Sequence, residues 1–224
     1  MKESVFLSTY HFLGIIYLIN VKNIYKNCFS FPLKTEYLIK DYIREYFRDS
    51  DKNRIYALGI DIPKNILDEI NSELETYNIK IASGMAFKRK NYLNPSHTDC
   101  HLDYSSFHER TIKSSLVIPI DGCDDTHMYW YDGDYSADVV IPSQDFAYAY
   151  PYMKLTWNKP GTLVEQVEIS KGPMLCRVDA PHSATSRKDG SYRLVMTLRF
   201  EENLSIEEIM TRRGLIDKTS IKVE

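Results

Sequence analysis

An eight-residue stretch near the middle of the chain, SHTDCHLD, holds two histidines and two aspartates at alternate positions, namely His97, Asp99, His101 and Asp103. In an extended strand successive side chains point to opposite faces, so these four would share one face. Imidazoles and carboxylates gathered on one side of a strand suit a metal ion better than a dry core. The pattern therefore predicts a metal site that needs a further ligand from elsewhere in the chain.

We predict that the further ligand is His182, which lies 85 residues after His97 in the segment APHSATS. Pro181 can end a β-ladder there and leave the histidine facing inward at the mouth of a barrel. Two histidines and one carboxylate, with the other positions of the ion open, are the ligand set expected of non-haem Fe(II) oxygenases. Arg193 opens the strand pattern RLVMTLRF. If its strand lies beside that of His182, its guanidinium can bind a carboxylate through two parallel hydrogen bonds.

The central stretch contains two H-x-D pairs, and the residues alone leave the choice between them open. A proline just before the first pair supplies a turn into the strand, whereas the second pair lies nearer the strand pattern SSLVIPI. We prefer His97 and Asp99 as metal ligands and keep His101 and Asp103 as the alternative pair. The pair that does not bind the metal is expected to orient the ligands or, with Tyr104, to face the substrate.

The composition bounds the class of protein. The chain has 28 Lys and Arg against 31 Asp and Glu, so a net charge of −3 gives no clear nucleic-acid footprint. Four widely spaced cysteines without a CxxC motif predict free thiols rather than a disulfide framework. No charged residue occurs between Glu3 and Lys22, but polar residues interrupt this stretch and no cleavage pattern follows it. We therefore predict a cytoplasmic protein without a membrane segment.

The elements that must position these residues follow from periodicity. Apolar residues at helical spacing predict helices over 35–47 and from Pro63 to about Tyr77, and a shorter helix from Ser205 to near Gly214. From Ile79 to Glu201, short runs rich in β-branched and aromatic residues predict about nine strands. We expect a single domain, mainly β with flanking helices. Its predicted parts are a helix-rich N-terminal support over 1–78, a jelly-roll or double-stranded β-helix core over 79–201, and a C-terminal helix and tail over 202–224.

About half of the chain, from Ile79 to Phe200, resembles the Fe(II)/2-oxoglutarate-dependent oxygenase superfamily. The resemblance rests on the order of an H-x-D motif, the strand SLVIPI followed by Gly-Cys and by MYWY, the segments GPML and APHSATS, and an arginine in RLVMTLRF. It implies a double-stranded β-helix in which the H-x-D motif and the distal histidine hold Fe(II). Carried over, the ligands are His97, Asp99 and His182, and Arg193 pairs with the far carboxylate of 2-oxoglutarate.

The resemblance also implies an activity. The enzyme would use 2-oxoglutarate and O2 as cosubstrates, and a carboxylate ligand points to hydroxylation, because halogenating relatives lack it. Tyr129 and Tyr131 share a strand face by alternation and are predicted to line the pocket and donate to the cosubstrate, with core packing as the alternative. Arg199 shares the strand face of Arg193 and is the fallback anchor, although we expect it to be paired in solvent. Asp179 is expected to hold the ring of His182 or to cap a turn.

Two other classes of protein stay open. One is a cupin-like metal enzyme that uses three histidines, for example His97, His101 and His182, and no 2-oxo acid. The other is a catalytically inactive β-barrel that only binds a sugar, peptide or protein partner. The remaining histidines, His11, His108 and His127, are expected to be surface or hydrogen-bonded residues. A small-molecule or peptidyl substrate is expected, and the loop from Tyr104 to Thr111 is expected to select it.

Overall fold

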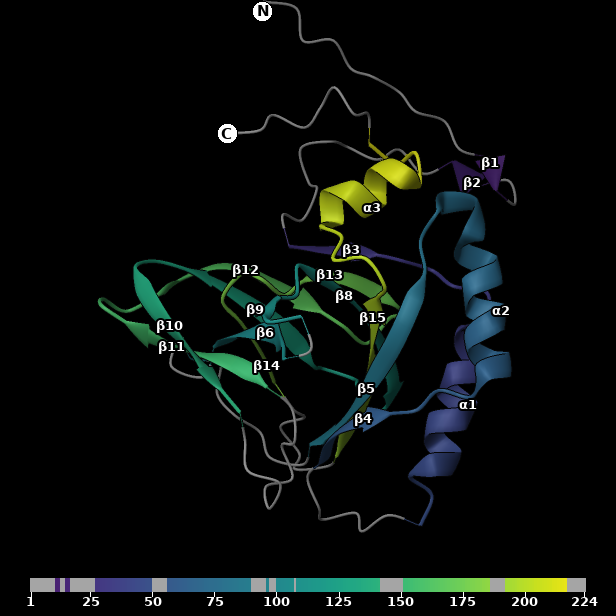
Figure 1. Ribbon diagram of the computed structural model, residues 1–224, viewed down its shortest axis with the longest axis horizontal. Helices are drawn as coiled ribbons and strands as arrows, with labels where there is room; N and C mark the ends of the chain where they lie inside the picture. Colours follow the sequence, from purple (N-terminus) through teal and green to yellow (C-terminus); the bar gives the residue numbers. More distant parts are fainter. Residues whose placement is uncertain are drawn as a thin grey trace, which may run out of the picture.

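The protein is described by a computed structural model, which places residues 11–12, 15–16, 27–49, 56–89, 96, 100–106, 108–141, 151–185 and 192–216 (Figure 1). The described chain is mainly β, with two antiparallel sheets and three α-helices. This confirms that the protein is mainly β with flanking helices, whereas the jelly-roll or double-stranded β-helix core stays a prediction. The division into a single domain stays a prediction.

The first sheet has six strands in the order β3-β13-β8-β15-β5-β4. Their bounds are β3 Cys28–Ser30, β13 Met174–Arg177, β8 Ser114–Asp121, β15 Arg193–Phe200, β5 Ile81–Arg89 and β4 Tyr56–Ile60. Both faces of β15 are buried, which explains why RLVMTLRF lacks the alternation of a strand with one wet face.

The second sheet has the order β10-β11-β6-β14-β9-β12, with β7 paired to β6. Their bounds are β10 Tyr135–Val140, β11 Tyr152–Trp157, β6 His101–Ser105, β14 His182–Ala184, β9 His127–Asp132, β12 Thr162–Glu168 and β7 Arg110–Thr111. A separate pair of two-residue strands is formed by β1 (His11–Phe12) and β2 (Ile15–Ile16). The β10–β11 hairpin extends away from the helices (Figure 1).

The three helices lie where periodicity placed them. They are α1 (Glu36–Tyr46), α2 (Lys64–Leu74, continued by the 3-10 helix η2 over Glu75–Tyr77) and α3 (Ile206–Arg212). Helices α1 and α2 cover the face of the first sheet that points away from the second (Figure 1). Ile39 and Ile43 of α1 are fully buried there because they lie one turn apart on its apolar face. Ser205 and Glu208 form a capping box that begins α3.

The space between the sheets holds a second core, which includes Val117, Met128, Trp130, Cys176 and Val195. A third cluster lies on the outer face of the second sheet and consists of Cys100, Leu102, Tyr129, Tyr131 and Leu155. All four cysteines of the chain are free and buried, as the sequence predicts. Among the described helices, none combines the length and the apolar character needed to cross a membrane.

Two strand boundaries differ from the prediction. In the run SHTDCHL, the described strand β6 begins only at His101. His182, predicted to follow the end of a strand, opens a short strand of its own, β14.

Candidate metal centre

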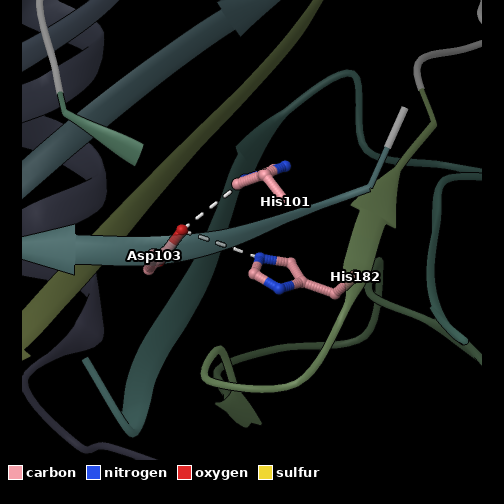
Figure 2. Close-up of side chains that lie close together, drawn as sticks. All are labelled: His101, Asp103 and His182. Carbon is pink, nitrogen blue, oxygen red and sulfur yellow. Dashed lines mark ion pairs between the residues drawn. The ribbon is translucent and has the colours of Figure 1, made fainter. Parts of the chain in front are cut away.

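His101, Asp103 and His182 converge on the inner face of the second sheet (Figure 2). Oδ1 of Asp103 lies 3.5 Å from Nε2 of His101 and 3.7 Å from Nε2 of His182. One ligand atom from each residue lies within 4.8 Å of the others. Two imidazole nitrogens and one carboxylate oxygen at this spacing form a group that can hold a divalent metal ion.

Strand pairing brings the three residues together. His182 lies opposite His101 on one side of β14 and opposite Trp130 on the other. Residues opposite one another in an antiparallel ladder share a face, so both imidazoles point between the sheets. Asp103 lies two residues after His101 and therefore shares that face. Its backbone N–H donates to the carbonyl of Val178 at 2.9 Å, which fixes the strand at the ligand itself.

The ring of His182 is held in the orientation that a metal ligand needs. Its Nδ1 lies 3.0 Å from the carbonyl oxygen of Ala180. Because a carbonyl only accepts, Nδ1 carries the hydrogen and Nε2 keeps its lone pair toward Asp103. The ring of His182 is thus held by the backbone carbonyl of Ala180 and not by the side chain of Asp179. Burial, together with the nearby His101, lowers the pKa of His182 to about 4, so the ring is neutral at neutral pH.

The second oxygen of Asp103 is bound by an arginine. Oδ2 forms a 2.6 Å ion pair with Nη2 of Arg199, whose Nη1 donates to Oγ of Ser115. Burial alone would raise the pKa of Asp103, but Arg199 and the two imidazoles hold that pKa well below its ordinary range. The expectation that Arg199 is paired in solvent is therefore wrong, because its side chain is buried between the sheets. With Oδ2 engaged, Oδ1 is the oxygen available to an ion.

Arg193 is also buried, and it shares the inner face of β15 with Arg199. Its Nη1 donates to the carbonyl of Thr185, three residues after His182. The strands of Arg193 and His182 lie in facing sheets, so the condition that they are neighbours in one sheet is not met. Arg193 still points toward the strand that carries the distal histidine.

Tyr129 and Tyr131 share a face, as alternation predicts, but it is the outer face of the second sheet. Trp130 between them lies opposite His182 and points inward, so its two neighbours point outward. There they pack against Leu102 and Leu155. This placement argues against contacts between these tyrosines and a cosubstrate, and it favours the packing alternative.

The preferred pair of the sequence analysis, His97 and Asp99, lies outside the described residues. The structure therefore brings the alternative pair together with His182 and leaves the first pair, and the three-histidine set, as predictions. His127 begins β9 and His108 lies in an exposed turn before β7, and neither belongs to the group. The side chain of His11 is not described.

A pocket of about 400 Å³ opens close to Arg199. Its walls are the end of β15, the start of β5 and the β6–β7 hairpin. Ser83 and Met85 lie opposite Arg199 and Thr197 in the β5–β15 ladder, so these two wall residues lie on the face of the first sheet that points toward Asp103. Tyr104, which follows Asp103 directly, also lines the pocket. The pocket therefore adjoins the metal-binding group through Arg199.

Comparison with protein-family models finds no match, and comparison with curated proteins finds none. Among solved structures, the X-ray structure of E. coli ycfD matches with 14% identity and a TM-score of 0.33. The match covers 71% of this chain and 38% of that protein, so this chain spans well under half of its length. A likeness of this size carries no argument about function, which is therefore inferred from the geometry.

Proposed function

We propose that the protein is a non-haem Fe(II)- and 2-oxoglutarate-dependent oxygenase that hydroxylates a small molecule or a side chain. The observation that carries the proposal is the convergence of His101, Asp103 and His182, which join two segments far apart in the sequence. Two histidines and one monodentate carboxylate leave several positions of an octahedral ion open, as an oxygenase requires. The alternative pair of the sequence analysis thus becomes our proposed ligand pair.

The strand order supports a double-stranded β-helix as the frame of the site. Eight strands make up this frame when β7 and the β10–β11 hairpin are set aside as insertions, and in chain order they are β5, β6, β8, β9, β12, β13, β14 and β15. Numbered one to eight, they lie in the orders 6-3-8-1 in the first sheet and 2-7-4-5 in the second. These two strand orders are those expected of a jelly roll, in which most successive strands alternate between two facing sheets. In it, the second and seventh strands are neighbours, and these carry the three proposed ligands.

Each protein group has a definable task. An Fe(II) ion, when bound, supplies the activation of O2 and two positions for the 2-oxo acid. His182 presents a neutral lone pair because Ala180 holds its other nitrogen. Arg199 holds Oδ2 of Asp103, which keeps this ligand ionised and prevents it from binding the ion through both oxygens.

Arg193 remains our proposed anchor for the far carboxylate of 2-oxoglutarate. It lies on the inner face of β15, and its guanidinium donates to the carbonyl of Thr185, which lies three residues after the distal histidine, His182. Arg199 is the weaker choice because its charge already serves Asp103.

Anaerobic addition of Fe(II) and 2-oxoglutarate tests the proposal, since a chelated 2-oxo acid gives a weak visible charge-transfer band. His182→Ala should abolish the band, and Arg193→Ala should mainly raise the 2-oxoglutarate concentration that is needed for it. Asp103→Ala should abolish the charge-transfer band, whereas Asp99→Ala should leave the band unchanged. The reverse result for the two aspartates would return the ligand role to the first pair.

Two results would overturn the assignment. A band that is unaltered in both His182→Ala and Arg193→Ala would remove the proposed site. Stoichiometric metal binding without a band at saturating 2-oxoglutarate would favour a cupin-like metal enzyme that uses no 2-oxo acid. The cytoplasmic location and the class of substrate stay predictions.

A further inference from the structure

The pocket beside Arg199 presents a distinctive set of polar groups. Ser83, Tyr104 and Ser106 are among the residues that line it, and no hydroxyl of the three has a hydrogen-bond partner among the described residues. Arg110 lines it as well and forms neither an ion pair nor a side-chain hydrogen bond within the described chain. These groups are available to a ligand, and all of them can donate hydrogen bonds.

The charges around the pocket do not cancel Arg110. Two glutamates also line it, but Glu201 pairs with Lys80 at 2.9 Å and Glu202 pairs with Arg212 at 2.7 Å. Both cations lie outside the lining. The guanidinium of Arg110 therefore supplies a positive charge that the described residues leave unbalanced, in a pocket lined also by three hydroxyl-bearing residues.

The position of Arg110 is fixed by the strand ladder. It lies opposite Ser105 in the β6–β7 pair, and Tyr104 lies opposite Thr111. This hairpin continues directly from Asp103: Tyr104 lies on the same strand, β6, and Arg110 lies on its partner strand, β7. Met85 and Ile112 add an apolar wall to the same pocket. A volume of about 400 Å³ fits a small molecule and not a folded partner.

We propose that this pocket binds a small organic oxyanion, a carboxylate or a phosphate ester. Its anionic group lies at Arg110, where a planar fork of N–H donors matches two oxygens, and its apolar part lies against Met85 and Ile112. The oxyanion is the substrate of the oxygenase; this last step rests on the proposed function, whereas the binding site itself does not. Arg110 then selects for acidic substrates.

Binding to the metal-free protein tests the site without any turnover. The probes are hexanoate, its neutral analogue hexanamide, and pentyl phosphate, titrated in EDTA and followed by saturation-transfer NMR of the probe. We expect at least one anion to bind tenfold or more tightly than hexanamide. The tighter anion then identifies carboxylate or phosphate as the preferred group.

Arg110→Met should bring the anions to within about threefold of hexanamide. Lys159→Met is the matched control, because it removes the same charge from an exposed turn away from the pocket and should keep the preference. Arg110 is exposed, so both variants are expected to fold. Equal binding of hexanoate, pentyl phosphate and hexanamide to the unaltered protein would overturn the proposal. An anion preference that persists in Arg110→Met would also overturn it, because the anions would then bind elsewhere, for example at Arg193.

The two proposals fail separately. If the charge-transfer band is absent but anion binding depends on Arg110, the oxyanion site stands and the oxygenase falls. If the band forms but no probe shows dependence on Arg110, the oxygenase stands and the acidic substrate is rejected.

Discussion

Asp103 divides its two oxygens between different tasks. Oδ1 faces both imidazoles, and Oδ2 is held by the buried guanidinium of Arg199. A buried carboxylate without a cation would be costly, so Arg199 accounts for the presence of this charge inside the protein before any ion binds. The arrangement makes Arg199 a positioning residue for the metal site.

Removing that guanidinium should weaken metal binding. In Arg199→Met the pKa of Asp103 should rise, because burial is then opposed only by the two imidazoles. We expect the affinity for Co(II), measured by calorimetry at pH 7, to fall by about 10- to 100-fold. Arg199→Lys should recover part of the loss, since it restores the charge without the fork.

Arg193→Met is the control for the loss of a buried arginine from the same strand face. It should leave Co(II) affinity within about threefold of the unaltered protein, because its described partner is the Thr185 carbonyl and not a ligand. Equal Co(II) affinity in Arg199→Met and the unaltered protein would show that Asp103 needs no positioning.

The stability of the metal-free protein should fall in mild acid. The pKa of His182 is about 4 in the folded protein and about 6.5 when unfolded. Between these values the unfolded chain binds a proton that the folded protein rejects, so the free energy of unfolding falls as pH falls and is unaffected by this group above pH 7. The depressed pKa of Asp103 acts in the same direction at still lower pH.

Urea unfolding at pH 7 and pH 5 measures this effect. His182 should contribute a loss of about 1.4 kcal/mol per pH unit at most in this window. His182→Gln should remove that part of the slope while it keeps a polar group on β14. An identical pH dependence in the variant would mean that His182 is not the group that resists protonation.

At the scale of elements, the helices were predictable and the strand partners were not. Apolar stripes, a proline at the start of α2 and the capping serine of α3 are local signals, and all three helices lie where these signals placed them. Sheet order depends on contacts between residues far apart in the chain, so the sequence predicted neither the short strand β14 nor its partners. The role of Arg193 was predicted on the condition that its strand lies beside that of His182, but the two strands lie in facing sheets.

The same limit applies at the site, where the choice between the two H-x-D pairs stays untested. Both H-x-D pairs have the same parity, so spacing could not separate them. Alternation predicted that Tyr129 and Tyr131 share a face of their strand, but it could not tell the inner face from the outer one. The pairing of Trp130 with His182 places Trp130 on the inner face and therefore the two tyrosines on the outer face. Parity also placed Arg199 on the face of Arg193, but its partner, Asp103, comes from the other sheet.

Helix α1 should stabilise the fold through its buried stripe. Ile43 is fully buried against the first sheet, so Ile43→Ala removes apolar contacts and leaves a cavity. We expect the free energy of unfolding in urea to fall by about 2–4 kcal/mol. Tyr37→Ala on the same helix, at a side chain that is 58% exposed, should cost less than about 1 kcal/mol. Similar losses in the two variants would contradict the packing of α1.

At the scale of the whole molecule, the proposed ligands tie together two segments about 80 residues apart, on β6 and β14. An ion that binds the folded state alone raises stability by about 2.7 kcal/mol at a concentration of 100 times Kd. For a chain of this size, that corresponds to a rise in Tm of about 5–10 °C. We expect Co(II) to produce such a rise and EDTA to reverse it.

The thermal shift has its own controls. His182→Ala should abolish it, whereas His127→Ala should retain it, because His127 lies outside the three-residue group. A shift that survives in His182→Ala would place the ion elsewhere in the molecule.

Trp130 gives the protein an intrinsic optical probe. The indole is fully buried, its Nε1 donates to the carbonyl of Arg177 at 2.9 Å, and the residue lies opposite His182 in the ladder. The chain has only one other tryptophan, Trp157, on the β10–β11 hairpin. In a Trp157→Phe background, the emission of a single fluorophore should therefore be quenched when a paramagnetic ion enters. Occupancy could then be followed in solution without labelling the protein.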